Sequence, residues 1–450
     1  MIRKHIKRRE KLFMVKFLDR IFGLSRKGAK ISTELLGGLT TFLTMAYIVF
    51  VNPDILSASG VDFGAAFVAT ALVAALSTIG MGLWANLPVA LAPGMGLNAF
   101  FSFTVVFGMG YTWQQALAAV FVSGLIYMAI AFSGLRKVVI SSIPPVLKKA
   151  IGAGIGFFIA FIGFKNAGIV VDNPATLVGL GDLSLPSTLL AVFGLAVTIA
   201  LLALKLRAAV FFGLVITAIA GSVAGILGVD GMPEFTGFVG SVPSIAPTFG
   251  ALFSEIGTVV SSGAGWIAIG TFLFVDFFDT AGTLVAVVER IPGSSEKEVD
   301  RANHVDSAAT VVGSVLGTST TTSFIESLSG IGAGAKTGLA SVFTGLLFLL
   351  TLFLSPLLSL VTASVTAPAL VVVGSMMALS LNDIEWEDLA SRLAGFTTAL
   401  VMVLTFSIPN GIGFGFIVYV IASVFSGKFK NLNVVLVLLS LLFVAYYAFL

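Results

Sequence analysis

Fourteen hydrophobic stretches, each bounded by polar or turn-forming residues, follow one another along the chain. Most of them approach the about 20 apolar residues that a helix needs to cross a bilayer. This pattern predicts an all-α polytopic membrane protein with 14 transmembrane spans. A further apolar stretch at 431–450 either crosses the membrane or packs along its surface. The fourteen stretches are 33–51, 63–85, 88–107, 113–132, 145–165, 186–204, 210–227, 264–288, 303–316, 318–332, 338–354, 363–380, 390–407 and 412–426.

A long polar gap separates the first seven stretches from the second seven. An odd number of spans in each half gives the halves opposite orientations, which is the inverted-repeat arrangement found in many transporters. The expected organisation is a basic head (1–30), a first repeat (31–228), a polar extracellular connection (229–263), a second repeat (264–428) and an extra C-terminal apolar segment (429–450).

Composition and charge add a location and an orientation. Charged residues make up 10% of the chain, against about 25% in soluble domains. Eleven of the 25 Lys and Arg residues lie within residues 1–30, which should hold the N-terminus in the cytoplasm. The apolar residues of this head favour an amphipathic segment on the inner leaflet over a nucleic-acid-binding arm. We expect a multi-pass protein of the cell membrane, with Met1 and Met14 both open as the native start.

The third and tenth stretches contain residues that break helices. Stretch three holds Pro88, Pro93, Gly94 and Gly96, and stretch ten holds six hydroxyl residues in a row at 318–323. Proline and glycine disfavour helix interiors, and threonine favours extended backbone. We therefore expect short extended segments that break spans 3 and 10. Each break alone could be a proline kink or a threonine-rich packing face, but interrupted helices at matched positions of two halves indicate a transport site. The expected backbone of that site includes Gly94, Gly96, Thr322 and Ser323.

Four polar side chains lie deep inside the apolar stretches. Asp276 and Asp279 are three residues apart in stretch eight, so they share one face of a helix. Glu326 follows the hydroxyl run, and Asn98 follows the glycine turn of stretch three. A carboxylate at this depth costs about 2.5–3.5 kcal/mol or more, so such residues are usually functional. An acid that gains and loses a proton here would suit proton coupling; the alternative is that one Asp only supports a broken helix.

Several long motifs in this order resemble one family. The segments 34–56, 87–101, 272–285 and 317–331 are similar to the AzgA-like branch of the nucleobase–cation symporter-2 family. The resemblance implies purine uptake (adenine, or hypoxanthine and guanine) driven by protons, by a protein that is not an enzyme. It also implies inverted halves of seven spans, with a core from spans 1–4 and 8–11 and a gate from spans 5–7 and 12–14. Its essential polar residues correspond to Asn98, Asp276, Asp279 and Glu326.

A purine offers N–H donors and ring or carbonyl acceptors along its edges. We expect Asp276 and Glu326 to accept ring N–H groups, and Asn98 with the half-helix N–H groups to donate. Asp279 or Glu326 would support the site or carry the proton, and Phe277 or Phe324 would provide a stacking face. An elevator-like sliding of core against gate would move the purine. No cofactor or metal is expected.

Other activities fit these residues less well. Paired membrane carboxylates also occur in intramembrane aspartyl proteases, but the Gly-x-Gly-Asp context of those enzymes is missing around Asp276 and Asp279. A carrier of the same fold for uracil, xanthine or an anion is the nearer alternative, although an anion carrier would favour a cation at the site. The purine preferred, the number of protons and a homodimeric state stay open.

Overall fold

The computed structural model describes residues 15–133, 143–288, 290–291 and 294–449, and this part of the chain is mostly helical. The elements of the first half are α2 (Ile31–Met45), α3 (Ile48–Ser57), α4 (Phe63–Gly80), η1 (Met81–Ala85), β1 (Leu91–Pro93), α5 (Met95–Ala99), η2 (Phe100–Gly108), α6 (Trp113–Ser133), α8 (Pro145–Asn166), β2 (Val170–Asn173), β3 (Leu177–Leu180), α9 (Pro186–Ala203) and α10 (Ala209–Ile226).

The second half repeats the pattern of long helices interrupted by one short strand. Its elements are α11 (Ile256–Val260), α12 (Gly263–Val288), α13 (Glu296–Leu316), β4 (Thr321–Ser323), α14 (Ser327–Gly332), α15 (Gly338–Thr351), η3 (Leu352–Leu360), α16 (Ala363–Met377), η4 (Ala378–Asp383), α17 (Leu389–Leu404), α18 (Ile408–Phe425), η5 (Phe429–Asn431) and α19 (Val434–Phe449).

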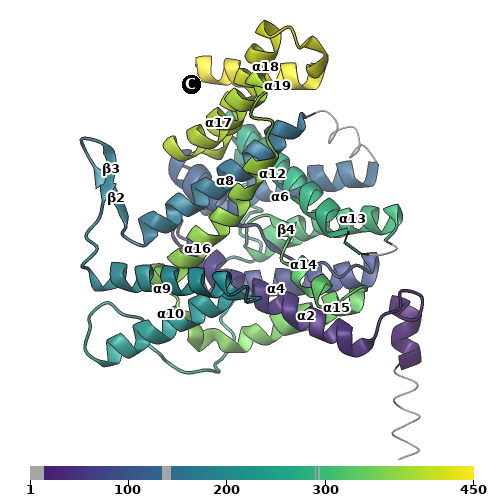
Figure 1. Cartoon of the computed structure of the whole chain (residues 1–450), viewed down its shortest axis with the longest axis vertical. Coiled ribbons are helices and arrows are strands. Elements are labelled where there is room, and N and C mark those ends of the chain that lie inside the picture. Colours follow the sequence, from purple (N-terminus) through teal and green to yellow (C-terminus); the bar gives the residue numbers. More distant parts are fainter. Residues whose placement is uncertain (1–14, 134–142, 289, 292–293, 450) are drawn as a thin grey trace, which may run out of the picture.

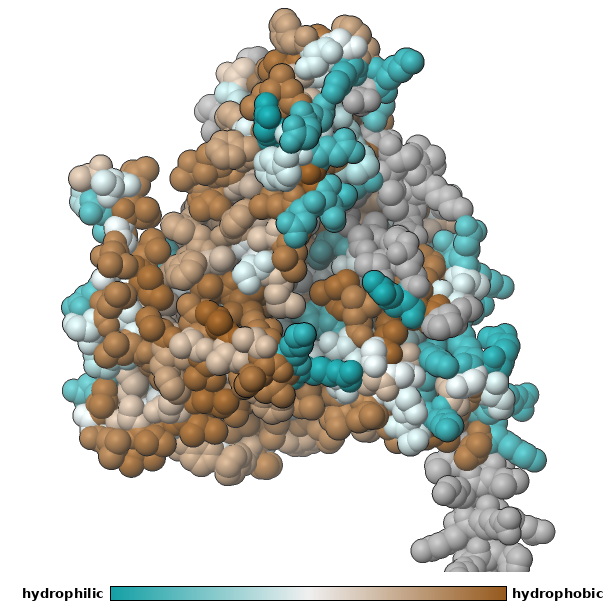
Figure 2. All heavy atoms as spheres, viewed as in Figure 1, coloured by the Kyte–Doolittle hydropathy of each residue, from teal (hydrophilic) through white to brown (hydrophobic). Residues whose placement is uncertain are grey.

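Hydropathy marks many of these helices as membrane-spanning. Nine helices within the described ranges are long and apolar enough to cross a bilayer. Figure 2 shows a broad hydrophobic surface over the region of α9 and α10, with hydrophilic residues at both edges of the molecule. The helical membrane fold is therefore confirmed, whereas the count of fourteen crossings stays a prediction.

The start of α13 and a hairpin after α8 differ from the sequence expectation. Helix α13 begins at Glu296, seven residues before the expected start at 303, because Ser295 and Glu298 form a capping box that starts a helix in polar sequence. The strands β2 and β3 pair as a hairpin that the hydrophobic pattern did not predict. The C-terminal stretch forms α19, which packs against α18, and the Tyr447 hydroxyl donates to the Asn410 carbonyl over 3.3 Å.

The two broken segments meet each other. Strand β1 pairs antiparallel with β4, with Ala92 opposite Thr322, and together they form the β1–β4 ribbon near the centre of the molecule (Figure 1). The N–H of Gly94 donates to the Thr320 carbonyl over 2.9 Å, which extends the pairing past Pro93, whose nitrogen has no hydrogen. The expectation of extended segments within spans 3 and 10 is confirmed.

The helices pack mainly in two groups. One group contains α2, α3, α4, α6, α12, α13 and α15, and the other contains α8, α9, α10, α16, α17 and α18. These are the sets of spans that the family resemblance assigns to a core and a gate. Within the second group, a Cβ on Gly374 would lie 2.3 Å from the carbonyl oxygen of Gly156, so small residues let α8 and α16 approach closely.

Candidate functional site

Three consecutive residues of β4 are linked to three different acids, Thr321 through the Thr310 hydroxyl and Thr322 and Ser323 through their own hydroxyls. The Thr310 hydroxyl accepts the backbone N–H of Thr321 over 3.3 Å and donates to Oδ2 of Asp276 over 3.0 Å. The Thr322 hydroxyl hydrogen-bonds to the carboxyl group of Asp279. The Ser323 hydroxyl donates to Oδ1 of Asp306 over 2.9 Å. The hydroxyl-rich sequence of β4 thus positions carboxylates from both α12 and α13.

The acids around β4 divide by their exposure. Asp276 is 1% exposed and Asp306 is fully buried, whereas Asp279 is exposed and Glu326 is half-buried. The division follows the strand geometry, since Thr322 points to the opposite face from Ser323. The ion pairs between described residues are Lys27–Glu298, Lys149–Asp383 and Lys428–Asp388, so none of them neutralises an acid of the site. The site therefore has one accessible and one enclosed acidic side.

Glu326 is held at the start of α14. It occupies the residue before that short helix, and the Tyr47 hydroxyl donates to its Oε1 over 2.9 Å. Tyr47 lies between α2 and α3 and is 1% exposed. The contact fixes one carboxylate oxygen of Glu326 and joins the first span to the tenth.

Asn98 is held by a second asparagine. Its amide Nδ2 donates to Oδ1 of Asn52 over 2.9 Å. The Asn52 amide in turn donates to the hydroxyls of Thr70 over 2.7 Å and Thr318 over 2.9 Å. Both asparagines are fully buried. Asn52 thus connects α3, α4, α5 and the segment leading into β4, and by holding the amide nitrogen of Asn98 it sets the direction in which the amide oxygen of Asn98 points.

Unpartnered polar atoms gather at the β1–β4 ribbon. Nine buried side-chain oxygens of the described residues lack a hydrogen-bond partner, and five of them belong to Asn98, Asp276, Ser319, Thr320 and Thr321. Buried polar groups are usually paired, so such a concentration calls for a specific explanation. A polar ligand or ordered water at this point would supply the missing partners.

The structure brings most of the sequence-predicted residues to this ribbon. The predicted residues around it are Asn98, Asp276, Asp279 and Glu326. Thr322 and Ser323 lie in its strand β4. A Cβ on Gly94 would lie 3.1 Å from the Thr322 hydroxyl oxygen, so glycine permits the close approach there. Phe324 directly follows β4 and is 6% exposed. The ring of Phe277 instead packs edge-on against Tyr127 of α6, with 5.5 Å between ring centroids.

Sequence reasoning missed four residues of this site, Tyr47, Asn52, Asp306 and Thr310. Tyr47 and Asn52 lie in the first span, where nothing local distinguishes them from packing residues. Asp306 follows a polar run, so its neighbourhood resembles the end of a helix. A usable signal was its spacing from Thr310, because residues four apart share a helix face.

Comparisons with known proteins point in one direction. A family model described as "Permease family", for xanthine and uracil permeases, matches residues 32–414. The guanine/hypoxanthine permease PbuG of Bacillus subtilis is 48% identical over 441 residues, which cover 95% of this chain and 99% of that protein. The adenine permease AdeP of Escherichia coli is 41% identical, with 95% of each chain covered.

Solved structures share the fold at low sequence identity. The transmembrane domain of the cyanobacterial bicarbonate transporter BicA is similar with a TM-score of 0.61 and 15% identity, covering 87% of this chain and 97% of that one. The structure of SLC26A9 is similar with a TM-score of 0.62 and 12% identity, covering 93% of this chain and 70% of that one. At these identities the likeness describes the architecture alone.

Proposed function

Because the chain belongs to the xanthine/uracil permease family, also called nucleobase–cation symporter-2, we propose that it imports purine nucleobases by proton symport. Family membership and relatives named permeases identify a multi-pass membrane transporter and not an enzyme. The names of PbuG and AdeP support a purine as substrate, without a choice between adenine and hypoxanthine or guanine. The cell membrane and a cytoplasmic N-terminus complete the proposal, supported by the basic head.

The excess of acceptors at the ribbon is the observation that carries this proposal. The site presents carboxylates on its accessible side at Asp279 and Glu326, and an unpartnered amide oxygen on Asn98. A purine ring carries N–H donors that match such acceptors, and hydrogen bonds to charged groups are the stronger ones. Phe324 is the remaining candidate for a stacking face, since the Phe277 ring is engaged with Tyr127.

Exposure also separates the roles of the two aspartates of α12. The sequence assigned substrate contact to Asp276 and support to Asp279. The burial of Asp276 beside Asp306 and the exposure of Asp279 favour the reverse assignment. Two carboxylates enclosed together without a nearby cation are costly as a doubly charged pair. We therefore assign the transported proton to the Asp276–Asp306 pair and purine contact to Asp279 and Glu326.

Uptake measurements test the substrate and the driving force together. Cells or liposomes containing the protein should accumulate labelled adenine, hypoxanthine or guanine, and a protonophore should stop accumulation above the outside concentration. Uracil and xanthine serve as competitors that report the alternative substrates of this family. Accumulation that survives the protonophore would exclude proton symport. Stronger competition by uracil or xanthine than by unlabelled adenine, hypoxanthine or guanine would exclude the proposed substrates.

Transport by sliding of the core against the gate is the mechanism we propose. The two helix groups meet where α2 packs against α10 and α3 against α16, and the short helix α5, which follows β1, packs against α8 of the second group. A Cβ on Gly96 would lie only 2.4 Å from Cγ2 of Ile155, so the surfaces are in close contact beside Asn98. A smooth, glycine-containing surface suits relative movement of two packed bodies.

Substitution of Gly96 by Ala is expected to slow transport about tenfold while purine binding changes little. An added methyl group in a packed contact costs about 1–3 kcal/mol, and here the cost depends on the relative position of α5 and α8. Counterflow rates and equilibrium binding in detergent would be measured side by side. Ile155→Ala in the same chain should restore the rate, and Gly270→Ala, whose Cβ would meet no atom within 4 Å, is the matched control. Equal loss of binding and transport would argue against movement at this contact.

A further inference from the structure

An apolar groove runs along the outer face of the first helix group, away from the β1–β4 ribbon. It has a volume of 410 Å³ and lies between α4, α6 and α13, with Trp84 of η1 at one end. Large side chains along it are exposed, among them Leu76 (51%), Phe132 (63%) and Val312 (43%). In a membrane protein such a surface faces acyl chains, so the question is whether anything selects the lipid.

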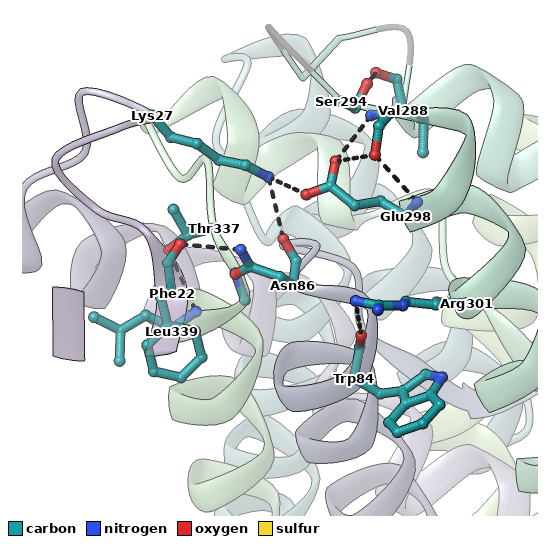
Figure 3. A network of polar contacts seen from close by, with 12 residues as sticks. Phe22, Lys27, Trp84, Asn86, Val288, Ser294, Glu298, Arg301, Thr337 and Leu339 are labelled. Atoms are coloured by element: carbon teal, nitrogen blue, oxygen red, sulfur yellow. Dashed lines mark hydrogen bonds and ion pairs between the residues drawn. The ribbon is translucent and has the colours of Figure 1, made fainter. Parts of the chain in front are cut away.

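The Trp84 end of the groove carries a cation. Figure 3 shows Arg301 extending from α13 towards Trp84. Its guanidinium donates to the Trp84 carbonyl over 3.5 Å and lies 5.7 Å from the centre of the indole ring. Trp84 is 59% exposed, as is typical of tryptophan at a membrane–water interface.

The acid of this network, Glu298, is already engaged. Glu298 is 2.8 Å from the Lys27 ammonium (Figure 3). It also accepts the backbone N–H of Ser295 over 2.8 Å. Within the described ranges, no carboxylate lies within 4.0 Å of the Arg301 guanidinium. The positive charge of Arg301 is therefore available to a ligand.

Charge and apolar lining are aligned along one helix face. One face of α13 carries, at helical spacing, Arg301, Val305, Ala308 and Val312. The first and last of these are about 16 Å apart along the helix axis. At the side of the groove, the His304 ring stacks on Phe132, with centroids 4.1 Å apart and planes at 9°. A cation at the polar end of an apolar groove complements a molecule with an anionic head and a hydrocarbon chain.

We propose that this groove binds an anionic phospholipid, with its phosphate at Arg301 and one acyl chain along α4 and α13. Basic pockets between transmembrane helices bind acidic lipid head groups elsewhere in membrane proteins. All three helices of the groove belong to the group that contains α12, so the lipid travels with the substrate-binding group. The proposal does not depend on which nucleobase is transported.

Lipid binding to the purified full-length protein tests the proposal. The delipidated protein is titrated with phosphatidylglycerol or with phosphatidylcholine of the same chains, and retention is measured by native mass spectrometry with thermal stability as a second readout. We expect tighter binding of phosphatidylglycerol. Arg301→Gln should weaken it about fivefold and remove the preference over phosphatidylcholine, as expected for one surface cation. Arg301→Lys should keep part of the preference.

Two further variants distinguish lipid binding in the groove from a general effect of positive charge on the protein surface. Ala308→Phe should reduce binding of both lipids, because the larger side chain fills the groove. Arg392→Gln removes an exposed arginine of α17 outside the groove and should leave the binding of both lipids unchanged. Equal binding of the two lipids by the unmodified protein would overturn the proposal. So would an Arg392→Gln variant that loses the phosphatidylglycerol preference as fully as Arg301→Gln does.

Discussion

Replacement of Asp276 by Asn is expected to abolish purine accumulation while leaving purine binding nearly unchanged. The substitution keeps the size of the side chain and an acceptor for the Thr310 hydroxyl, which lies 3.0 Å from Oδ2. It removes the group that can take up a proton beside Asp306. Affinity for the purine should change by less than about fivefold, or ~1 kcal/mol.

The neighbouring aspartate provides the contrast that makes this result informative. Asp279→Asn removes a carboxylate from the accessible side of the site. Hydrogen bonds to charged groups contribute about 1.5–3 kcal/mol, so we expect binding to weaken about tenfold to a hundredfold. Asp300→Asn, at an exposed aspartate near the start of α13, is the matched control and should behave like the unmodified protein.

Binding by calorimetry and accumulation in proteoliposomes with an imposed pH gradient would be compared for the three variants. The reverse pattern, in which Asp276→Asn loses binding and Asp279→Asn only slows exchange, would return Asp276 to the role of substrate contact. Normal purine accumulation by the Asp276→Asn variant would exclude Asp276 both as a substrate contact and as a carrier of the proton.

Substitution of Asn52 by Leu is expected to raise the KM for purine at least tenfold. Leucine has a similar size but removes the oxygen that accepts from Asn98 and the amide that donates to Thr70 and Thr318. Each buried polar group left without a partner costs about 1–3 kcal/mol. Asn98 would then lose the contact that orients its amide towards the ribbon.

A positioning role for Asn52 differs from a merely structural one in its effect on affinity. Thr70→Val removes one acceptor of the same amide but leaves the Asn52–Asn98 hydrogen bond in place. We expect it to lower thermal stability with little change in KM, whereas Asn52→Leu changes both. An Asn52→Leu protein that inserts into the membrane and shows an unchanged KM would contradict the positioning role.

The local chemistry of the sequence was sufficient to predict the helical membrane fold and part of the candidate site. Long apolar runs predict helices in a bilayer wherever they occur, and Pro93 and the hydroxyl run at 318–323 interrupt helices whatever surrounds them. A carboxylate within apolar sequence is costly in a membrane and therefore conspicuous. Asp276, Asp279 and Glu326 could be selected on this ground without a structure. The hydrophobic pattern misplaced a boundary where a capping box extends a helix into polar sequence, at the start of α13.

Only the tertiary structure decided how these acids are divided and which residues hold them. Tyr47 and Glu326 are 279 positions apart in the chain, and Asn52 and Thr318 are 266 apart. No local pattern encodes such pairs, because they arise when β1 and β4 come together and bring their helices with them. The same pairing turns Thr322 towards Asp279 and Ser323 towards Asp306. The sequence by itself determined that acids lie within the membrane, and the packing around one short ribbon decided which of them are accessible and which are enclosed.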